Sequence, residues 1–428
     1  MPLTDHTAPA PTDSTQPLES DQPIDDNHTR RGQHRAFDGI LLASFGGPEK
    51  PEDVMPFLRN VTRGRGIPEE RLEEVSHHYQ AMDGQSPIND QNRELLRDLR
   101  AELDRRGIEL PVVWGNRNWH PFMRDAVDEL YAQGKRHILG IATSAYSSYS
   151  SCRQYREDFG TILRDSGRDG EMTIDKIRTY FNVPGFLDPV VDGVDDALTS
   201  LLDEGLTLPE IRVVFTTHSI PLTMADTSGP EDTHERGSGG WYVEQHLAAC
   251  RYVAGAIAQR RDIAVTDLMD DPDQQTASGP LLRWQLAYQS RSGPPQVPWL
   301  EPDIVDVIEE ISASDDVCRG IVVAPIGFVT DHVEVIWDLD KEAREAAEEH
   351  GLTFRRVATA GHDPRFITAL VDLIEERLDP ARPRAALTDF GMTPDVCGRR
   401  CCPGRTIRPT TSGIDSDEDC ARAEQESA

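Results

Sequence analysis

The sequence predicts an α/β protein in which parallel β-strands are joined by helices, arranged as two βαβ halves. From residue 37 onward, short apolar segments alternate with amphipathic segments of helical length, which is the pattern of parallel sheets covered by helices. The apolar segments are runs such as "GIVVAP" and "RVVF", far shorter than the roughly 20 residues that a membrane helix needs. We therefore expect a chain without a membrane span.

The predicted strands are short segments rich in Val, Ile, Leu and Phe. In chain order they read "DGILLASF", "PVVWG", "HILGIATS", "DKIRTY", "IRVVFTTH", "RGIVVAPIGF" and "FRRVATA". The helices predicted between them include "NDQNRELLRDLRAELDRRG", "VVDGVDDALTSLLDEG" and "DKEAREAAEEHG". In "GHDPRFITALVDLIEERL", Asp363 is the expected N-cap and Pro364 the first helical residue. Residues 270–300 carry Pro, Gly and Gln and are predicted to form an irregular loop.

Four regions follow from this pattern. Residues 1–36 are polar and lack an apolar core, so we interpret them as a disordered arm and not as a secretory signal. The first half is expected at 37–205 and the second at 206–385, joined by a helix at 188–205. Residues 386–428 form a cysteine-containing segment with a polar, acidic tail.

The charge of the chain excludes some classes of partner. With 75 acidic and 44 basic residues among 428, the net charge is -31. Such a chain repels phosphate backbones and anionic membrane surfaces, so we expect no nucleic-acid partner.

Three cysteines, Cys397, Cys401 and Cys402, lie within six residues in "VCGRRCCPG". They could be half of a disulfide framework, a zinc knuckle that lacks a ligand, or an iron–sulfur site completed from elsewhere. The chain has seven cysteines, an odd number, and no recognisable signal peptide, which favours a reducing cytoplasm. Metal or cluster chemistry is therefore the better prediction for this trio.

Polar and unusual residues follow several of the predicted strands directly. These segments are "SFGGP", "GNRNWHP", "TSAYSSYSSC", "TTHSIP" and "GFVTDHVEV". In parallel sheets, ligands bind outside the carboxyl ends of the strands. We expect all five segments to face one cleft between the two halves.

Two of these segments carry side chains suited to acid–base or metal chemistry. His218 ends the strand in "VVFTTHSIP", where a lone histidine is by default a structural hydrogen-bonding residue. Glu334, Asp338 and Glu342 recur at every fourth position, so a helix would align them on one face. A solvated acidic face would show the same spacing. A carboxylate opposite a histidine, however, could bind a divalent cation and transfer protons.

The order of the segments resembles the ferrochelatase family, whose members insert ferrous iron into a porphyrin. The resemblance covers about residues 37–380. It rests on "LLASFGGPEKPEDVMPFL", "YQAMDGQSPIN", "FTTHSIP", "LRWQLAYQSRSGPPQVPWLEP" and "APIGFVTDHVEVIWDLD", in that order. It implies two Rossmann-like halves of the class II chelatase fold around a central porphyrin cleft, with His218 and Glu334 facing each other across the macrocycle. Asp338 and Glu342 would then line a path for iron entry or proton exit.

The resemblance also implies a set of porphyrin-binding residues. Ser86, Tyr155, Arg63, Arg65 and Arg117 match family positions that line the pocket or contact the propionates. In addition, Phe45 stands where some bacterial relatives have a tyrosine that ligates the product iron. A phenyl ring cannot do so, which leaves the axial ligand open.

The substrate follows from the segment after "MPFLRN". Family members that take protoporphyrin from a membrane carry an apolar extension there, whereas this chain has the charged "VTRGRGIPEERLEEVSHHYQ". We therefore expect coproporphyrin III as substrate together with Fe²⁺, a cytoplasmic enzyme, and transient contact with the next enzyme of haem synthesis. Protoporphyrin IX is the alternative.

For the cysteines, the resemblance implies a [2Fe–2S] cluster held by Cys152, Cys397, Cys401 and Cys402. Zinc would also accept four thiolates, and one of the adjacent pair could be a bystander. Cys250 and Cys318 are expected in the core, and Cys420 has no evident partner.

Two further hypotheses for the function remain. A cobalt or nickel chelatase usually has more histidines near the metal, for which His332 is a candidate. A non-catalytic iron–sulfur or haem sensor on the same fold would not need the three carboxylates.

Overall fold

The computed structural model describes residues 36–64, 66–234, 239–269, 281–293, 296–314 and 316–427. The described residues from Phe37 onward belong to one compact unit. The predicted N-terminal arm, apart from its last residue, lies outside the described residues.

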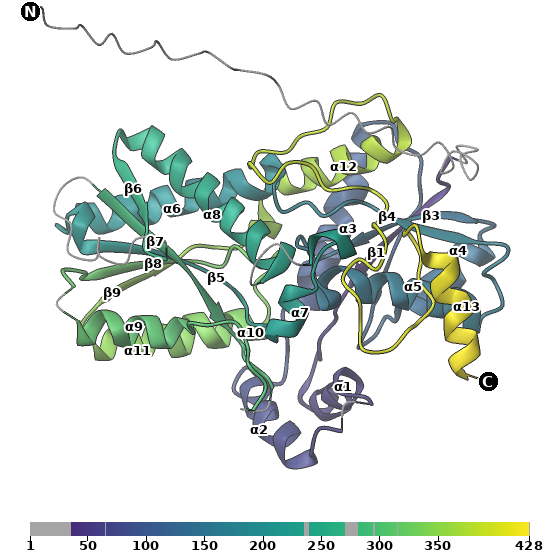
Figure 1. The fold of residues 1–428 in the computed structure, drawn as a ribbon, viewed down its shortest axis with the longest axis horizontal. Helices are drawn as coiled ribbons and strands as arrows, with labels where there is room; N and C mark the ends of the chain where they lie inside the picture. Colours follow the sequence, from purple (N-terminus) through teal and green to yellow (C-terminus); the bar gives the residue numbers. More distant parts are fainter. Residues whose placement is uncertain are drawn as a thin grey trace, which may run out of the picture. The chain divides into compact units, whose positions relative to one another are not determined.

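The first sheet has four parallel strands in the order β2-β1-β3-β4 (Figure 1). They are β1 (Gly39–Ser44), β2 (Val112–Asn116), β3 (His137–Ala142) and β4 (Thr173–Lys176). Every residue of β1 is buried. This explains its continuous apolar run, since a central parallel strand is covered on both faces.

The second sheet has five parallel strands in the order β6-β7-β5-β8-β9. They are β5 (Ile211–His218), β6 (Ala264–Asp267), β7 (Leu281–Gln289), β8 (Gly320–Ala324) and β9 (Thr353–Arg356). The predicted α/β fold with parallel sheets is therefore confirmed.

Helices cover the sheets, and one of them links their cores. The longer helices are α3 (Ile88–Arg105), α4 (Met123–Ala132), α5 (Gln154–Asp165), α6 (Pro184–Asp203), α8 (Gly240–Arg261), α9 (Ile304–Ala313) and α12 (Pro364–Leu378). Phe186 and Val191 of α6 belong to one hydrophobic cluster with Leu42 of the first sheet and Phe215 of the second. The two sheets thus share a core through α6. At the start of α12, the Asp363 carboxylate accepts the Arg365 N–H at 2.8 Å, as predicted for the N-cap.

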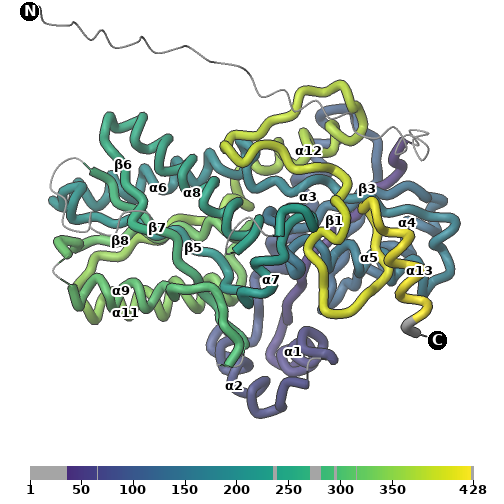
Figure 2. The backbone as a smooth tube through the Cα atoms, viewed as in Figure 1, coloured from purple at the N-terminus to yellow at the C-terminus, as the bar shows by residue number. Residues whose placement is uncertain are grey.

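Further helices complete the unit. One is α2 (Glu69–Gln80), and the short ones are α1 (Val54–Val61), α7 (Leu222–Asp226), α10 (Val333–Val335) and α11 (Arg344–Glu349), with π-helical segments η3 (Tyr149–Arg153) and η7 (Ile336–Ala343). In the trace of Figure 2, α1 and α2 lie below the sheets. Phe57 of α1 and Tyr79 of α2 pack in one apolar cluster with Val333.

The predicted loop at 270–300 is wrong over Leu281–Gln289, which forms β7 between β6 and β5. The sequence pattern does not predict this strand, because polar residues interrupt its apolar run. Arg283 is nevertheless fully buried, because its guanidinium pairs with Asp316 at 2.7 Å. Residues 270–280 and 294–295 of this range lie outside the described residues.

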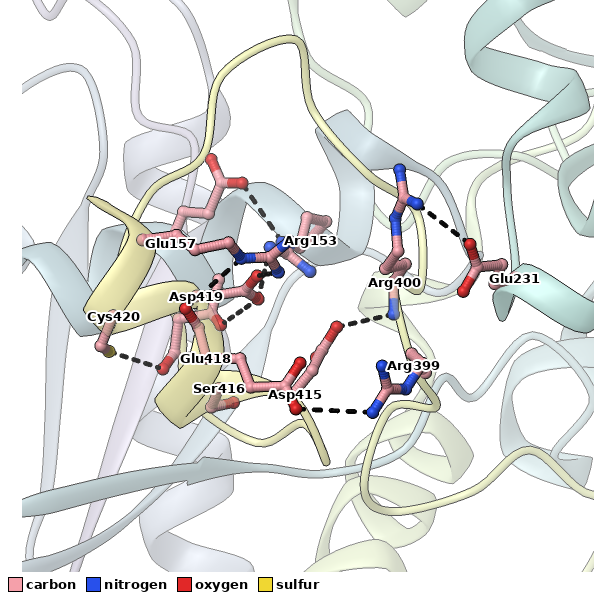
Figure 3. Close-up of polar contacts among 12 residues, drawn as sticks. Arg153, Glu157, Glu231, Arg399, Arg400, Asp415, Ser416, Glu418, Asp419 and Cys420 are labelled. Atoms are coloured by element: carbon pink, nitrogen blue, oxygen red, sulfur yellow. Dashed lines mark hydrogen bonds and ion pairs between the residues drawn. The ribbon is translucent and has the colours of Figure 1, made fainter. Parts of the chain in front are cut away.

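The C-terminal segment, predicted to end in a polar, acidic tail, contains regular secondary structure. Cys397 and Gly413 form a parallel β-bridge, and Ser416–Ser427 forms helix α13. In Figure 3, the side chains of this segment meet those of α5 and η3, and Arg153 donates to Asp419 at 2.8 Å. Cys420, for which no partner was expected, donates a weak hydrogen bond to the Thr410 carbonyl at 3.9 Å. We call residues 397–427 the C-terminal strap.

Candidate active site and cysteine site

His218 and Glu334 lie side by side although 116 positions separate them in the sequence. His218 ends β5, and its Nδ1–H donates to the Ser219 carbonyl at 2.5 Å. A carbonyl can only accept, so Nδ1 carries a proton, and in the neutral ring the lone pair therefore stands on Nε2. Nε2 faces the Glu334 carboxylate at 4.0 Å. The pair therefore offers an imidazole base and a carboxylate at one point.

His332 is the third member of this group. Its Nδ1 lies 3.9 Å from the same Glu334 oxygen, so one carboxylate stands between two imidazoles. Burial lowers the pKa of His332, and the adjacent Glu334 opposes that effect. Neutral imidazole is the form that can bind a metal ion or accept a proton.

The 4.0 Å contact leaves no room for a porphyrin between His218 and Glu334. A flat ring needs about 3.5 Å on each face, or roughly 7 Å between the flanking atoms. The Glu334 side chain is 49% exposed, so it is free to rotate away. The expected placement across a macrocycle thus requires this contact to open.

The acidic helix differs from the prediction in its geometry. Residues 336–343 form a π-helix instead of the expected α-helix, so hydrogen bonds span five residues. Between side chains of this helix, the indole N–H of Trp337 donates to the carboxylate of Glu342 at 2.7 Å. Asp338 lies between Glu334 and Glu342, whose charges both raise its pKa.

Asp338 is the most perturbed carboxyl group of this site. Burial, aided by the neighbouring carboxylates, raises the pKa of Asp338 to about 7. The Ser290 hydroxyl donates to its Oδ2, as does the Gln289 amide at 3.3 Å. Asp338 can therefore gain or lose a proton near neutral pH.

A cavity of about 270 Å³ borders the same helix. It is lined by Ala81, Met82, Ile336, Trp337, Asp340 and Lys341. The His78 ring stacks on Trp337 at 4.3 Å, and the Lys341 ammonium lies 3.8 Å from that indole. This cavity does not include His218 or Glu334.

The structure brings Arg117 and Tyr155 together but buries both. The Arg117 guanidinium lies 4.0 Å from the Tyr155 ring centroid and donates to Asp158 at 2.5 Å. Nη2 of Arg117 has no partner within the described ranges. Asp158, which sequence analysis missed, is thus the charge partner of Arg117.

Ser86 and Arg63 are the other predicted porphyrin-binding residues that the structure describes. Ser86 is buried, and a Cβ on Gly47 would come within 2.6 Å of its Cβ, so it packs against the loop after β1. Arg63 is exposed and donates to Asn60 at 2.6 Å. Arg65 lies outside the described residues.

Phe45 is one of the exposed large apolar side chains, at 39%. Its ring meets Phe57 edge-on at 6.3 Å, and Phe57 in turn contacts Tyr79 and Trp119. The nearby Glu334 contributes to raising the pKa of Tyr79, although burial is the larger cause. These four rings therefore form an aromatic group, and its member Tyr79 lies near the Glu334 carboxylate.

A buried network that sequence analysis missed supports His218 from behind. The Tyr242 hydroxyl donates to the His218 carbonyl at 2.7 Å. Burial lowers the pKa of His246 to about 3, so its ring is neutral. Its Nδ1–H donates to the Tyr242 carbonyl at 2.6 Å, and Nε2 accepts from Thr217 at 2.8 Å. Of the residues in this network, only Thr217 lies in a segment that the sequence analysis singled out, "TTHSIP".

The four cysteines predicted as ligands converge. Cys397 accepts hydrogen bonds from Cys152 and Cys401, and Cys401 Sγ lies 3.8 Å from Cys402 Sγ. The Cys402 sulfur also accepts the Gly229 N–H at 3.1 Å. Hydrogen bonds from Cys152 and Cys401, assisted by Arg156, hold the pKa of Cys397 well below its usual range.

Within the described ranges, no three His, Cys, Asp or Glu side chains are disposed around one metal ion. Cys250 and Cys318 are buried elsewhere in the core, as predicted. No helix of the described residues is long and apolar enough to cross a membrane.

Comparison with solved structures gives distant neighbours. The structure described as SirB from Bacillus subtilis with Fe3+ is 12% identical, with a TM-score of 0.44, and the match covers 81% of this chain and 97% of that chain.

Comparison with curated proteins gives closer relatives. The protein of Streptomyces coelicolor named coproporphyrin III ferrochelatase is 50% identical over 386 residues, which cover 89% of this chain and 97% of the relative. The protein of the same name from Leifsonia xyli subsp. xyli is 48% identical over 393 residues, covering 89% and 95%. The family described as Ferrochelatase matches residues 37–378. This chain therefore belongs to the ferrochelatase family.

Proposed function

We propose that this protein inserts Fe²⁺ into coproporphyrin III, giving iron coproporphyrin III in haem biosynthesis. The observation that carries the proposal is the free Nε2 of His218 at 4.0 Å from the Glu334 carboxylate. Relatives at 45–50% identity that carry the name coproporphyrin III ferrochelatase support the choice of substrate.

Metal insertion must remove two pyrrole protons and deliver an iron ion that has shed its waters. His218 Nε2 has the free lone pair to accept a pyrrole proton or to hold the incoming iron. Glu334 and His332 supply further ligands beside it. Asp338, with a pKa of about 7, would pass protons on towards Glu342 and solvent.

The substrate needs binding sites for its carboxylates. Arg117 keeps one unpartnered guanidinium nitrogen within the described residues, and Arg63 is exposed on the segment after α1. We assign propionate contacts to Arg63, Arg65 and Arg117, with Ser86 and Tyr155 lining the pocket. Helix α2 carries Glu69, Glu70 and both His77 and His78, and its buried side chains are few. Such a charged lip does not suit insertion into a membrane, so the substrate would arrive from the cytoplasm and be held by the arginines and not by this acidic helix. The product would pass to the next pathway enzyme by transient contact.

We also propose that Cys152, Cys397, Cys401 and Cys402 hold a [2Fe–2S] cluster. Two thiolates that share a tetrahedral metal at about 2.3 Å lie roughly 3.8 Å apart, which is the separation of the Cys401 and Cys402 sulfurs. Four converging thiols could offer a pair to each of two irons. When bound, the cluster would supply a redox-active, negatively charged centre that ties the strap to η3.

The test of the enzymatic proposal is anaerobic mixing of the protein with coproporphyrin III and Fe²⁺, followed by the porphyrin absorption bands. We expect metallation well above the rate in buffer, and slower metallation of protoporphyrin IX. The His218→Ala variant should lose roughly 10²–10⁴ in rate. Rates equal to those in buffer for both porphyrins would refute the proposal. For the cluster, we expect a brown protein whose visible absorption is lost in Cys152→Ser, whereas colourless protein containing zinc would refute it.

A further inference from the structure

Arg156 is a buried cation at the cysteine site, and it forms no salt bridge with any residue that the structure describes. It lies on α5 four residues after Cys152, one helical turn along the same face, and its side chain is fully buried. Its Nε donates to the Thr411 carbonyl at 2.6 Å and its Nη2 to the Ser416 hydroxyl at 3.4 Å. Both partners are neutral, and Nη1 has no partner among the described residues.

The guanidinium of Arg156 lies directly against the strap where it pairs with Cys397. Gly413 is the bridge partner of Cys397. A Cβ on Gly413 would lie only 1.8 Å from Nη2 of Arg156, so only glycine leaves room for the cation there. The charge of Arg156 acts most strongly on Cys397, Cys401 and Cys152.

Lys176 approaches the same group from the edge of the first sheet. It ends β4, is 5% exposed, and donates from Nζ to the Ile177 carbonyl at 2.8 Å, another neutral partner. The preceding Asp175 lies 3.5 Å from Ser412, whose carbonyl accepts the Cys397 N–H at 2.9 Å. The Lys176 charge acts on both Cys152 and Cys397.

Nearby carboxylates balance these two cations only in part. Asp415 is buried and its charge acts on Arg156, while its Oδ2 also accepts the backbone N–H of Arg400 at 2.7 Å, so it offsets at most one of the two positive charges. The adjacent Arg153 is already paired with Glu157 and Asp419. A buried charge without a counter-charge costs several kcal/mol, so a chain that buries Arg156 and Lys176 together calls for negative charge beside them.

We propose that Arg156 and Lys176 are the charge partners of the cysteine-bound cluster. This inference rests on the cluster proposed above. Two ferric ions, two sulfides and four thiolates carry two net negative charges, which the two cations match. One-electron reduction adds a further negative charge, so neighbouring cations favour the reduced state and raise the midpoint potential.

The test uses the full-length, cluster-loaded protein and the variants Lys176→Met, Arg156→Gln and Arg156→Lys. The matched control is Arg164→Gln, in the last turn of the same helix, where the side chain is 30% exposed and faces Asp165 at 4.0 Å. Midpoint potentials are measured by anaerobic dithionite titration of the visible absorption. Loss of iron and acid-labile sulfide to a chelator is followed in parallel.

We expect the midpoint potential of Lys176→Met and Arg156→Gln to fall below that of wild type, and both to lose iron severalfold faster. Arg156→Lys and Arg164→Gln should behave as wild type. If Arg156→Gln fails to fold, Lys176→Met decides the question, because its side chain makes a single backbone hydrogen bond. Unchanged potentials and iron loss in Lys176→Met with a full cluster would overturn this inference alone. A wild-type protein that binds zinc and no cluster would overturn the proposed cluster and this inference together.

Discussion

The hydroxyl group of Tyr242 donates a 2.7 Å hydrogen bond to the backbone carbonyl of His218. Tyr242 lies in the first turn of α8, where its own N–H is bound by the Ser228 hydroxyl at 2.7 Å. The neighbouring Gly229 donates to the Cys402 sulfur. One short path of bonds therefore joins the cysteine site to the backbone of the proposed catalytic histidine.

Tyr242→Phe should slow metallation without weakening porphyrin binding. Loss of a hydrogen bond worth about 0.5–1.5 kcal/mol predicts a decrease in kcat of roughly 2- to 12-fold, with the KM for coproporphyrin III unchanged. The pH profile of kcat should also shift, which loss of stability alone would not produce. Tyr252→Phe, on the same helix but bound only to Asp188 at 3.3 Å, is the control. Equal kcat values in the two variants would contradict the positioning role.

Glu334→Gln should separate porphyrin binding from metal insertion. The charge of Glu334 favours the contact with His218 that must open for the ring, so its removal should leave coproporphyrin affinity equal or higher. Insertion of Fe²⁺ should nevertheless fall by about 10²-fold or more, because the carboxylate is lost. Fluorescence quenching measures the affinity and absorption measures the insertion. Glu345→Gln, exposed on α11, should change neither. Weaker porphyrin binding by Glu334→Gln would argue against the opening of this contact.

Asp338→Asn should stabilise the protein in a pH-dependent manner. The carboxyl of Asp338 titrates near 7 in the folded state against 3.8 for the ordinary group. Between these values the folded state binds more protons than the unfolded state, so stability falls as pH rises through this window. The Asp338→Asn variant has no carboxyl group to ionise at this position, so it does not lose stability in this way. Its advantage in urea unfolding should therefore grow from pH 4 to pH 7 and then level off.

The control for this measurement is Glu348→Gln, an exposed residue of α11. It should show no comparable pH-dependent advantage. If Asp338→Asn and wild type have parallel stability curves from pH 4 to pH 8, Asp338 does not retain its proton in the folded protein.

Asp419→Asn should loosen the C-terminal strap. The carboxylate of Asp419 is buried and accepts from Arg153 at 2.8 Å and from Thr410 at 2.9 Å (Figure 3). Loss of one partner from a buried ion pair costs about 3–5 kcal/mol. Hydrogen exchange over residues 397–427 should rise sharply.

The matched control for the strap is Glu418→Gln. Glu418 pairs with Arg399 at 3.4 Å, and both side chains are more than half exposed. Exposed pairs contribute about 0–1 kcal/mol, so exchange in this variant should stay close to wild type. Similar protection in both variants would show that the buried pair does not hold the strap.

Local patterns in the sequence predicted much of the architecture. The apolar runs of β1, β5 and β8 and the N-cap of α12 each depend on neighbouring residues, so they could be recognised without knowledge of the fold. By contrast, β7 contains Arg283, which is buried only because Asp316, 33 positions away, neutralises it. The helix α13 contains Asp419, whose partner Arg153 lies 266 positions earlier.

The sequence by itself determined the parallel α/β class and the segments that carry the chemistry, whereas a pairing of His218 with Glu334 was an expectation from the family resemblance. Only the tertiary structure decided that these two side chains touch at 4.0 Å, that Asp338 lies in a π-helix, and that Tyr242 supports His218. The physical reason is that strand and helix patterns arise from contacts a few residues apart. Charge balance, burial and hydrogen-bond direction depend on groups that the fold brings together from distant parts of the chain.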